Sequence, residues 1–152
     1  MMIEIVPATL AHARAIELRP GDACEIAALG LSQKQAFDLS FSRALWSNAY
    51  LAGNGEVAAI VGLSAGCLLS GVGVPWLLTG RPVDRHRKDF LRLTRIGIAR
   101  MLRQFPILTN KVHADYREAV RWLGWLGFDI APARPYGPHA AFFHDATLSR
   151  TS

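Results

Sequence analysis

The chain has 152 residues, 51% of them hydrophobic and 19% charged, which predicts one compact domain over residues 1–152 with a core of its own. A net charge of +5 leaves a nucleotide cofactor, a nucleic acid or an acidic protein open as the partner. The amino terminus lacks the basic segment and long apolar run of a signal peptide, and Cys24 and Cys67 have no CxxC spacing. We therefore expect a cytoplasmic protein in which both cysteines are small buried side chains.

The first quarter of the chain predicts a strand followed by helices. Residues 3–6 alternate as a strand does, and Thr9 then caps a first helix that Pro20 ends. Asp22 and Glu25 have the spacing of a capping box, which predicts the start of a second helix.

Ser32 and Gln35 repeat the capping-box spacing and open the next helix. The apolar side chains of Phe37, Phe41 and Leu45 recur every four residues along it. They therefore share one helix face, which we expect to pack against the core.

The uncharged stretch over residues 57–80 is long enough to cross a bilayer. Glycines and a proline divide it into short runs, and the Asn-Gly pair at 54–55 is a strong hairpin signal. We therefore expect no membrane span but two buried strands, over 56–64 and 72–79, in the middle of a sheet. The segment 49–52 would pair with the first of them.

The last third predicts a long helix, a strand, a short helix and a final hairpin. A basic loop leads into the helix over 85–105, and a strand follows over 108–114. Asp115 and Glu118 have capping-box spacing, and Gly127 can take the left-handed conformation that ends a helix. Helices and strands along the whole chain predict a mixed α/β (α+β) fold.

Two tryptophans stand in the predicted short helix. Trp122 is centred on its apolar stripe, whereas Trp125 lies beside Arg121 and Gly124. We expect Trp122 to be buried as the inward anchor of this helix and Trp125 to be the more exposed of the two.

The order of these elements resembles that of the GNAT superfamily of N-acetyltransferases along nearly the whole chain. In that family the short helix begins with an Ala and ends in Leu-Gly-Phe; here Ala119 matches the Ala, and Leu126 to Phe128 match the triplet. Asp115 stands where the family often has Asn. The resemblance implies a single GNAT-like domain with a central mixed, mostly antiparallel sheet, flanked by helices and splayed after the strand that ends near Thr79. It also implies transfer of an acetyl group from acetyl-CoA to an amine of a small molecule or protein.

The resemblance further implies where acetyl-CoA binds. Its pantetheine amides would pair with the backbone of the second buried strand, and its phosphates would meet the basic loop and the start of the long helix. The family's loop has several glycines, whereas here Gly80 alone allows close approach and charged side chains replace the others. A solvated basic face is the alternative interpretation of those charges. The cofactor-binding residues so implied are Trp76, Leu77, Leu78, Gly80, Arg81, Arg85, His86 and Arg87.

The family's general acid is a Tyr in the short helix, and the matching residue here is Leu123, which cannot donate a proton. Tyr116 or a water must take its place, transfer must proceed by positioning alone, or the chemistry is absent. As candidate catalytic residues we name Tyr116 and Asp115. The candidates for a general base are Asp84, His86, His113 and Asp115.

The segments 73–80 and 120–128 also resemble GNAT-like proteins of short-tailed bacteriophages, which tend to have an eroded phosphate loop. That likeness implies an alternative: a catalytically silent domain, in the host cytoplasm or the virion, that binds a host or virion protein through its basic face. His139 and His144 are not spaced to hold one metal, and the basic helix lacks the interleaved aromatics of a nucleic-acid platform. We therefore expect neither a metal site nor a nucleic-acid partner.

Overall fold

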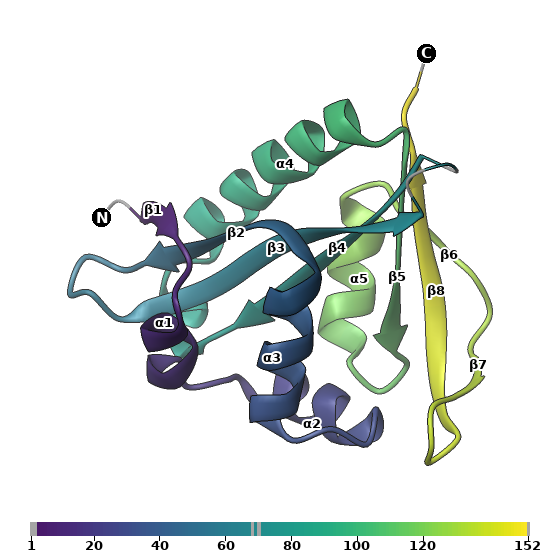
Figure 1. Ribbon diagram of the computed structural model, residues 1–152, viewed down its shortest axis with the longest axis horizontal. Helices are drawn as coiled ribbons and strands as arrows, with labels where there is room; N and C mark the ends of the chain where they lie inside the picture. The colour runs from purple at the N-terminus through teal and green to yellow at the C-terminus, as the bar shows by residue number, and fades with distance from the viewer. Residues whose placement is uncertain (1–2, 68, 70, 152) are drawn as a thin grey trace.

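A computed structural model describes residues 3–67, 69 and 71–151, and within them the chain folds as a single α+β domain (Figure 1). Its mixed sheet has eight strands: β1 (Glu4–Pro7), β2 (Ala44–Leu51), β3 (Val57–Cys67), β4 (Val72–Thr79), β5 (Ile107–His113), β6 (Asp129–Ile130), β7 (Arg134–Tyr136) and β8 (Ala141–Ser149). Five α-helices flank this sheet in the described residues: α1 (Leu10–Ala15), α2 (Pro20–Ala28), α3 (Gln33–Arg43), α4 (Arg87–Gln104) and α5 (Arg117–Trp125). A short 3₁₀-helix, η1 (Arg81–Arg85), precedes α4.

The sheet consists of two parts that meet at β4 and β5. Strands β1 to β4 pair antiparallel in chain order, and β5 continues the sheet parallel to β4. On its other side β5 pairs antiparallel with β8, which also carries β6 and β7. β4 and β5 pair at two positions, Val72 with Ile107 and Gly73 with Leu108, and diverge beyond them. The predicted splayed, mostly antiparallel sheet, with neighbouring strands over 72–78 and 108–114, is therefore confirmed.

Each face of the sheet has its own helices and its own core, and Figure 1 shows α4 apart from the group formed by α1, α2 and α3. The core on the α4 side includes Tyr50, Leu63, Phe90, Met101 and Leu108. The core on the α1–α3 side includes Ile16, Ile26, Phe37, Ile60 and Leu78. Because successive residues of a strand face opposite sides, β3 and β4 contribute to both cores. This explains why the stretch over 57–80 is uncharged.

The turn predicted at 54–55 is confirmed, since it joins β2 to β3 with Gly55 at a φ of +85°. The two buried strands predicted after it are β3 and β4. Among the residues that the structure describes, no helix has both the length and the apolar character needed to cross a membrane.

The ending of α5 also follows the prediction. Gly127 has a φ of +101° and its N–H donates to the carbonyl of Gly124. The Phe128 N–H donates to the carbonyl of Leu123, and together these two bonds make a Schellman motif. The motif turns the chain back so that Phe128 enters the core, where it is 5% exposed.

Thr9 caps α1 and the Ser32 capping box opens α3, as predicted, but other boundaries in the first half are wrong. Pro20 does not end α1; it is the first residue of α2, a position where its missing N–H has no partner to lose. Asp22 consequently lies inside α2, as does Glu25, and neither caps the helix. Leu45 belongs to β2 instead of the helix and is exposed.

Two boundaries in the second half are also wrong. α4 begins at Arg87 because η1 extends to Arg85 and His86 is the cap residue between the two helices. Tyr116 is the N-cap of α5 and makes no side-chain capping bond, so Asp115 and Glu118 form no capping box. The Glu118 carboxylate binds Arg19 instead, in a contact between the first turn of α5 and the N-cap of α2.

Cys24 is exposed on α2, contrary to the prediction that it is buried. On this helix the buried side chains are those of Asp22 and Ile26. Cys24 is two residues from each and therefore faces the opposite way. The side chain of Cys67 lies outside the described part of the chain.

Candidate functional site

A cleft of about 440 Å³ opens where β4 and β5 diverge, with α4 and α5 as its outer walls. Its volume falls in the range of small-molecule sites, roughly 300–1,000 Å³. At one end the two strands are joined, and Asn110 Nδ2 donates to the Pro75 carbonyl at 2.5 Å. At the other end they are apart, near Thr79 and Tyr116. We call the joined end, which continues to Met101, the deep end and the other the mouth.

The edge of β4 that faces the cleft presents an unpaired backbone at Leu77. Pro75 has no N–H, so its pair with Leu63 of β3 is not a hydrogen-bonded one. Hydrogen-bonded and non-bonded pairs alternate along an antiparallel ladder, and the register is unbroken here. Leu77 therefore also directs its N–H and C=O away from β3, toward a β5 that has already diverged. This backbone is available to a ligand in the cleft.

Apolar side chains surround the deep end. The polar groups there are largely bonded within the protein: Thr94 Oγ1 donates to the Leu91 carbonyl, and the Asn110 amide bonds β4. Tyr50 contributes a hydroxyl. The apolar wall comprises Val61, Phe90, Ile98, Met101 and Phe128.

The two tryptophans of α5 differ in exposure as predicted. Trp122 stacks on Phe90 with ring centroids 5.9 Å apart and lines the cleft. It is half-buried rather than fully buried, because one side of its ring faces this open space. Trp125 is 49% exposed and lies under the Arg95 guanidinium at 4.1 Å.

At the mouth, α2 bonds to the ends of both diverging strands. Asp22 accepts hydrogen bonds from the Thr79 hydroxyl at the end of β4 and from the Tyr116 hydroxyl, the latter at 3.0 Å. Glu25 Oε2 accepts the backbone N–H of His113, at the end of β5, at 2.9 Å. Burial raises the pKa of Asp22 to about 6 and the pKa of Glu25 to about 7. Two carboxyl groups that titrate near neutrality thus tie the strand ends together, and we call this pair the carboxyl clamp.

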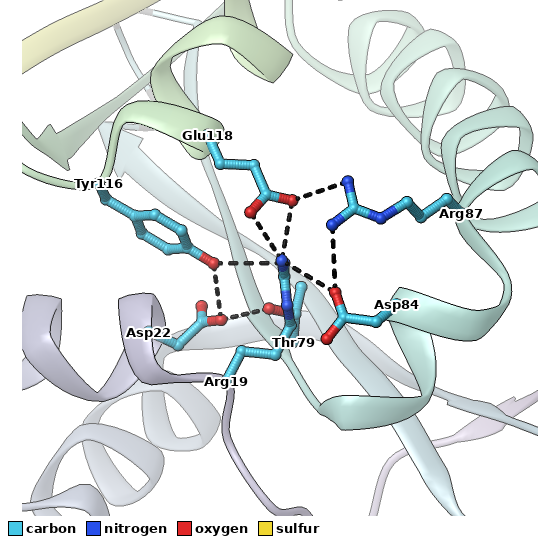
Figure 2. A network of polar contacts seen from close by, with 7 residues as sticks. All are labelled: Arg19, Asp22, Thr79, Asp84, Arg87, Tyr116 and Glu118. Carbon is cyan, nitrogen blue, oxygen red and sulfur yellow. Dashed lines mark hydrogen bonds and ion pairs between the residues drawn. The ribbon is translucent and has the colours of Figure 1, made fainter.

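Two arginines and two carboxylates form an ion-pair network beside the carboxyl clamp (Figure 2). Arg19 Nη2 donates to both oxygens of Glu118, at 2.8 and 2.7 Å, and lies 3.2 Å from Asp84 Oδ1. Arg87 contacts the same two carboxylates, at 3.2 Å for Glu118 and 3.3 Å for Asp84. The Arg19 side chain is 12% exposed and the other three are more open, so solvent weakens the outer pairs. The two positive and two negative charges of the network cancel.

Three of the residues predicted to bind the cofactor line the cleft: Trp76, Leu77 and Arg87. The side chain of Leu78 and the ring of Trp76, which packs against Phe41, both face the α1–α3 side, because residues two apart on β4 share a face. The others stand on η1 and its flanking residues, beyond the cleft walls; they are Gly80, Arg81, Arg85 and His86.

The backbone of the predicted phosphate loop is partly used within the protein. A Cβ on Gly80 would lie 2.6 Å from the Val57 carbonyl oxygen, so the glycine permits packing of the chain on itself. The N–H groups of Gly80 and Arg81 donate to the carbonyls of Ala58 and Glu17. Free N–H groups for an anion are therefore expected in the first turn of α4, where a helix has no partners for them.

The side chains of Arg81 and Arg85 pair outside the cleft. Arg81 lies 3.4 Å from Glu17, and Arg85 lies 3.4 Å from Glu56. All four side chains are more than half exposed, so these pairs hold the arginines weakly. Their role as phosphate ligands stays a prediction.

The two predicted catalytic residues lie in different surroundings. Tyr116 is at the mouth, where burial and the neighbouring Asp22 carboxyl raise the pKa of its phenol. Tyr116 is therefore protonated at neutral pH, and its hydroxyl donates to Asp22. Asp115 is 91% exposed, beyond the cleft walls and 3.8 Å from His113 Nε2. Leu123, at the family's Tyr position, lines the cleft with an apolar side chain.

Sequence reasoning missed most of the residues that build the mouth. Pro20 is the signal that leads to two of them, because a proline at the first helical position places Asp22 and Glu25 inside α2. Asp22 shares its helix face with Ile26, which is in the core. Nothing local in the sequence connects Arg19 with Glu118, which are 99 residues apart.

Comparison of the sequence with protein-family models and with curated proteins gives no match. Solved structures match the fold over nearly the whole chain. Ard1 from Thermoplasma volcanium has a TM-score of 0.72 and 14% identity, with 100% of each chain covered. Spermidine N-acetyltransferase from Vibrio cholerae, solved with CoA and spermine, has a TM-score of 0.72 and 8% identity, with 98% of this chain and 96% of that one covered. A GCN5-related N-acetyltransferase from Kribbella flavida has a TM-score of 0.69 and 18% identity, with 97% of each covered.

These similarities concern the fold of acetyltransferases and carry no information on bacteriophage proteins. The likeness of segments 73–80 and 120–128 to phage proteins stays a prediction. The same holds for a location in the cytoplasm or the virion and for a host or virion partner.

Proposed function

From the premise that this chain has the GNAT acetyltransferase fold, we propose that it binds an acyl-CoA in the cleft between β4 and β5 and transfers the acyl group to an amine. Acetyl-CoA is the simplest such donor. The Vibrio cholerae neighbour, with its CoA and spermine, supports the proposal by analogy of fold. The acceptor would be an amine of a small molecule or of a protein.

The observation that carries this proposal is the unpaired backbone of Leu77 at the edge of an apolar cleft. A pantetheine arm contains two amides joined by short carbon segments, so it can pair with a strand edge while its carbons lie against apolar walls. Ligands that add to a strand edge gain affinity from such main-chain hydrogen bonds. The backbone N–H and C=O groups of Trp76 and Leu78 bond to β3 instead. Of the three residues predicted to pair with the pantetheine amides, Leu77 therefore remains.

The phosphates of the donor would lie at the mouth. Arg87 and the first turn of α4 offer positive charge and free N–H groups there. To bind Arg87 and Arg19, a diphosphate would replace the carboxylates of Asp84 and Glu118 on the same guanidinium groups. The exposed Arg81 would then extend the positive surface.

The bound donor supplies an acyl group on a thioester carbon, from which the amine takes it as the CoA thiol leaves. We assign Glu25 as the base, because it lines the mouth and burial raises its pKa to about 7, close to the operating pH. Its carboxylate accepts the proton that an ammonium acceptor must lose. The thiolate, which lies past Leu77, takes the second proton, the one that the nitrogen loses as the amide forms. Tyr116 bonds Asp22 at the mouth, and its role as the acid stays a prediction. Asp115, exposed and outside the cleft, has no part in this scheme.

The test is calorimetric titration of the protein with acetyl-CoA, using a matched pair of variants at Leu77. Leu77→Pro removes the N–H that faces the cleft, and the ladder to β3 does not use that N–H. Leu77→Ala removes the same side chain and keeps the N–H. We expect the wild type and Leu77→Ala to bind, and Leu77→Pro to bind at least about tenfold more weakly, a difference of about 1.4 kcal/mol.

Absence of heat and of a thermal shift at millimolar acetyl-CoA and at millimolar longer-chain acyl-CoA would refute the proposal. Equal affinities of the two Leu77 variants would refute the assigned backbone contact.

The second candidate is a catalytically silent domain that binds another protein. The observation that favours it is the pairing of Arg19 and Arg87 with Asp84 and Glu118, which leaves little free charge where phosphates would bind. Under this alternative, acetyl-CoA does not bind, and reversing the charge of Arg81 and Arg85 leaves the fold intact but abolishes capture of the partner. Under the transferase proposal, the same reversal weakens acyl-CoA binding.

A further inference from the structure

The cleft continues well past the point where an acetyl group would end. From Leu77 it extends along β4 to the joined end, between the sheet and α4. Val61 and Leu77 form the sheet side of this space, and Ile98 with Met101 forms the helix side. Phe128 closes it from the turn between α5 and β6. An acetyl group offers one methyl to this apolar wall and leaves most of it uncovered.

A glycine in the middle of α4 enlarges this space. Gly97 lines the cleft, and a Cβ built on it would meet only the Tyr50 hydroxyl, at 3.6 Å. Ordinary van der Waals contact at that distance leaves room for an alanine, so packing within the protein does not require the glycine. Glycine in a helix interior nevertheless lowers helix stability relative to alanine. This loss of helix stability occurs at a position where the absence of a side chain makes the deep end wider.

The polarity of the two ends fixes the direction in which a donor would lie. The phosphates must stay at the mouth, since Arg87 and the amino end of α4 are there. Lys111 borders the cleft next to Asn110, but its ammonium pairs with Asp145. Pairing of the pantetheine amides with Leu77 then places the thioester beyond it. The acyl group consequently extends toward Gly97 and Met101.

We propose that the deep end binds a hydrocarbon chain, so that the acyl donor of this protein is a medium-chain acyl-CoA in preference to acetyl-CoA. The proposal rests on the proposed function and names its donor class. Burial of methylenes against Ile98, Met101 and Phe128 supplies the selectivity, because each buried methylene contributes about two- to fourfold in affinity. Gly97 is the residue that sets how much chain the deep end accepts.

The first arm of the test measures dissociation constants of the wild-type protein for CoA, acetyl-CoA, hexanoyl-CoA and octanoyl-CoA by calorimetry. We expect hexanoyl-CoA to bind at least about tenfold more tightly than acetyl-CoA, from the added methylenes. The readout is binding, so it does not depend on an acceptor amine.

The second arm uses Gly97→Leu, which fills the deep end from α4, and Ala99→Leu as a matched control. Ala99 is on the same helix but exposed, so its variant adds the same side chain on the outer surface. We expect the ratio of the octanoyl-CoA and acetyl-CoA affinities to fall toward one in Gly97→Leu and to keep its wild-type value in Ala99→Leu. If Gly97→Leu fails to fold, Ile98→Phe fills the same space and decides the question.

Equal wild-type affinities for all the thioesters would overturn this inference while leaving the proposed function standing. Retention of the chain-length preference in a folded Gly97→Leu or Ile98→Phe variant would also overturn it. Binding of no CoA compound at all would overturn both proposals.

Discussion

The mouth and the deep end of the cleft lie within one cavity and are built by opposite means. At the mouth, carboxyl groups and arginines from distant parts of the chain bond one another around Arg19 and Asp22. At the deep end, aromatic and aliphatic side chains pack around an open space between the sheet and α4. The comparison teaches that charged and titratable groups hold the mouth together, whereas the shape of apolar side chains defines the deep end.

The largest expected effect concerns the apolar wall. Trp122→Ala removes the ring that stacks on Phe90, and we expect a loss of about 3 kcal/mol in the free energy of unfolding, toward the low end for a tryptophan truncation. The low end applies because Trp122 is half-buried and its buried Nε1 has no hydrogen-bond partner among the described residues. Denaturant unfolding measures the loss, with Trp125→Ala as the control at a site that is 49% exposed. Equal losses in the two variants would contradict this account of α5.

The next effect concerns the carboxyl clamp and depends on pH. Because burial raises the pKa of Glu25 from 4.5 to about 7, the folded state binds this proton more tightly than the unfolded state does. Its contribution to stability is therefore greatest below pH 4.5 and declines as the pH rises through 7. Glu25→Gln keeps an acceptor for the His113 N–H and carries no charge, so we expect it to be more stable than the wild type at pH 8, by on the order of 2–3 kcal/mol.

Thermal or urea unfolding of the wild type and Glu25→Gln across pH 4 to 8 measures this difference. The control is Glu17→Gln, which removes a carboxylate that is 79% exposed and should not change the pH profile. If the stability of the wild type and that of Glu25→Gln changed with pH in the same way, the Glu25 carboxyl group would not be desolvated in the folded protein.

A smaller effect concerns the ion-pair network. Glu118→Gln releases Arg19 and Arg87 from a shared carboxylate, so we expect acetyl-CoA to bind about tenfold more tightly, or about 1.4 kcal/mol, while the fold loses some stability. Calorimetry gives the affinity, and Asp38→Asn serves as the control because its partner Lys34 is 85% exposed on α3, away from the cleft. Weaker binding in Glu118→Gln would mean that the network prepares the site and does not compete with the donor.

The smallest effect concerns the deep end. Gly97→Ala adds a methyl group where there is room for it, so we expect α4 to gain about 0.5–1 kcal/mol of stability from helix propensity alone. The midpoint of denaturant unfolding measures this gain. A loss of stability would mean that the deep end is already packed to its limit, which would also weaken the case for a bound hydrocarbon chain.

Much of the fold follows from local signals in the sequence. The uncharged stretch over 57–80 predicts β3 and β4 because a strand buried on both faces needs apolar residues throughout. Gly127 predicts the end of α5 because its left-handed backbone is needed there. Thr9 and Ser32 predict helix starts through hydrogen bonds that span only a few residues.

Much less of the site follows from the sequence, because its contacts join distant segments. The family resemblance predicts that Leu77 and Arg87 contact the ligand. The reason that the Leu77 backbone is free is the register of β4 on β3, which only the structure shows. Asp22 and Glu25 have the spacing of a capping pair, and only the placement of α2 across β4 and β5 makes them buried carboxyl groups. A helix cap and a buried carboxyl group differ in where the residue lies in the tertiary structure, and no local sequence pattern specifies that position.

The short joint between β4 and β5 has a mechanical consequence. Two residue pairs, Val72 with Ile107 and Gly73 with Leu108, connect the two parts of the sheet, and the strands separate from there. A small rotation of one part of the sheet about this pivot would displace atoms near the pivot less than atoms far from it. The width of the cavity is therefore set by the sheet itself beside the pivot. At the far ends of the strands it is set by the carboxyl clamp, which holds Thr79 and His113 through α2.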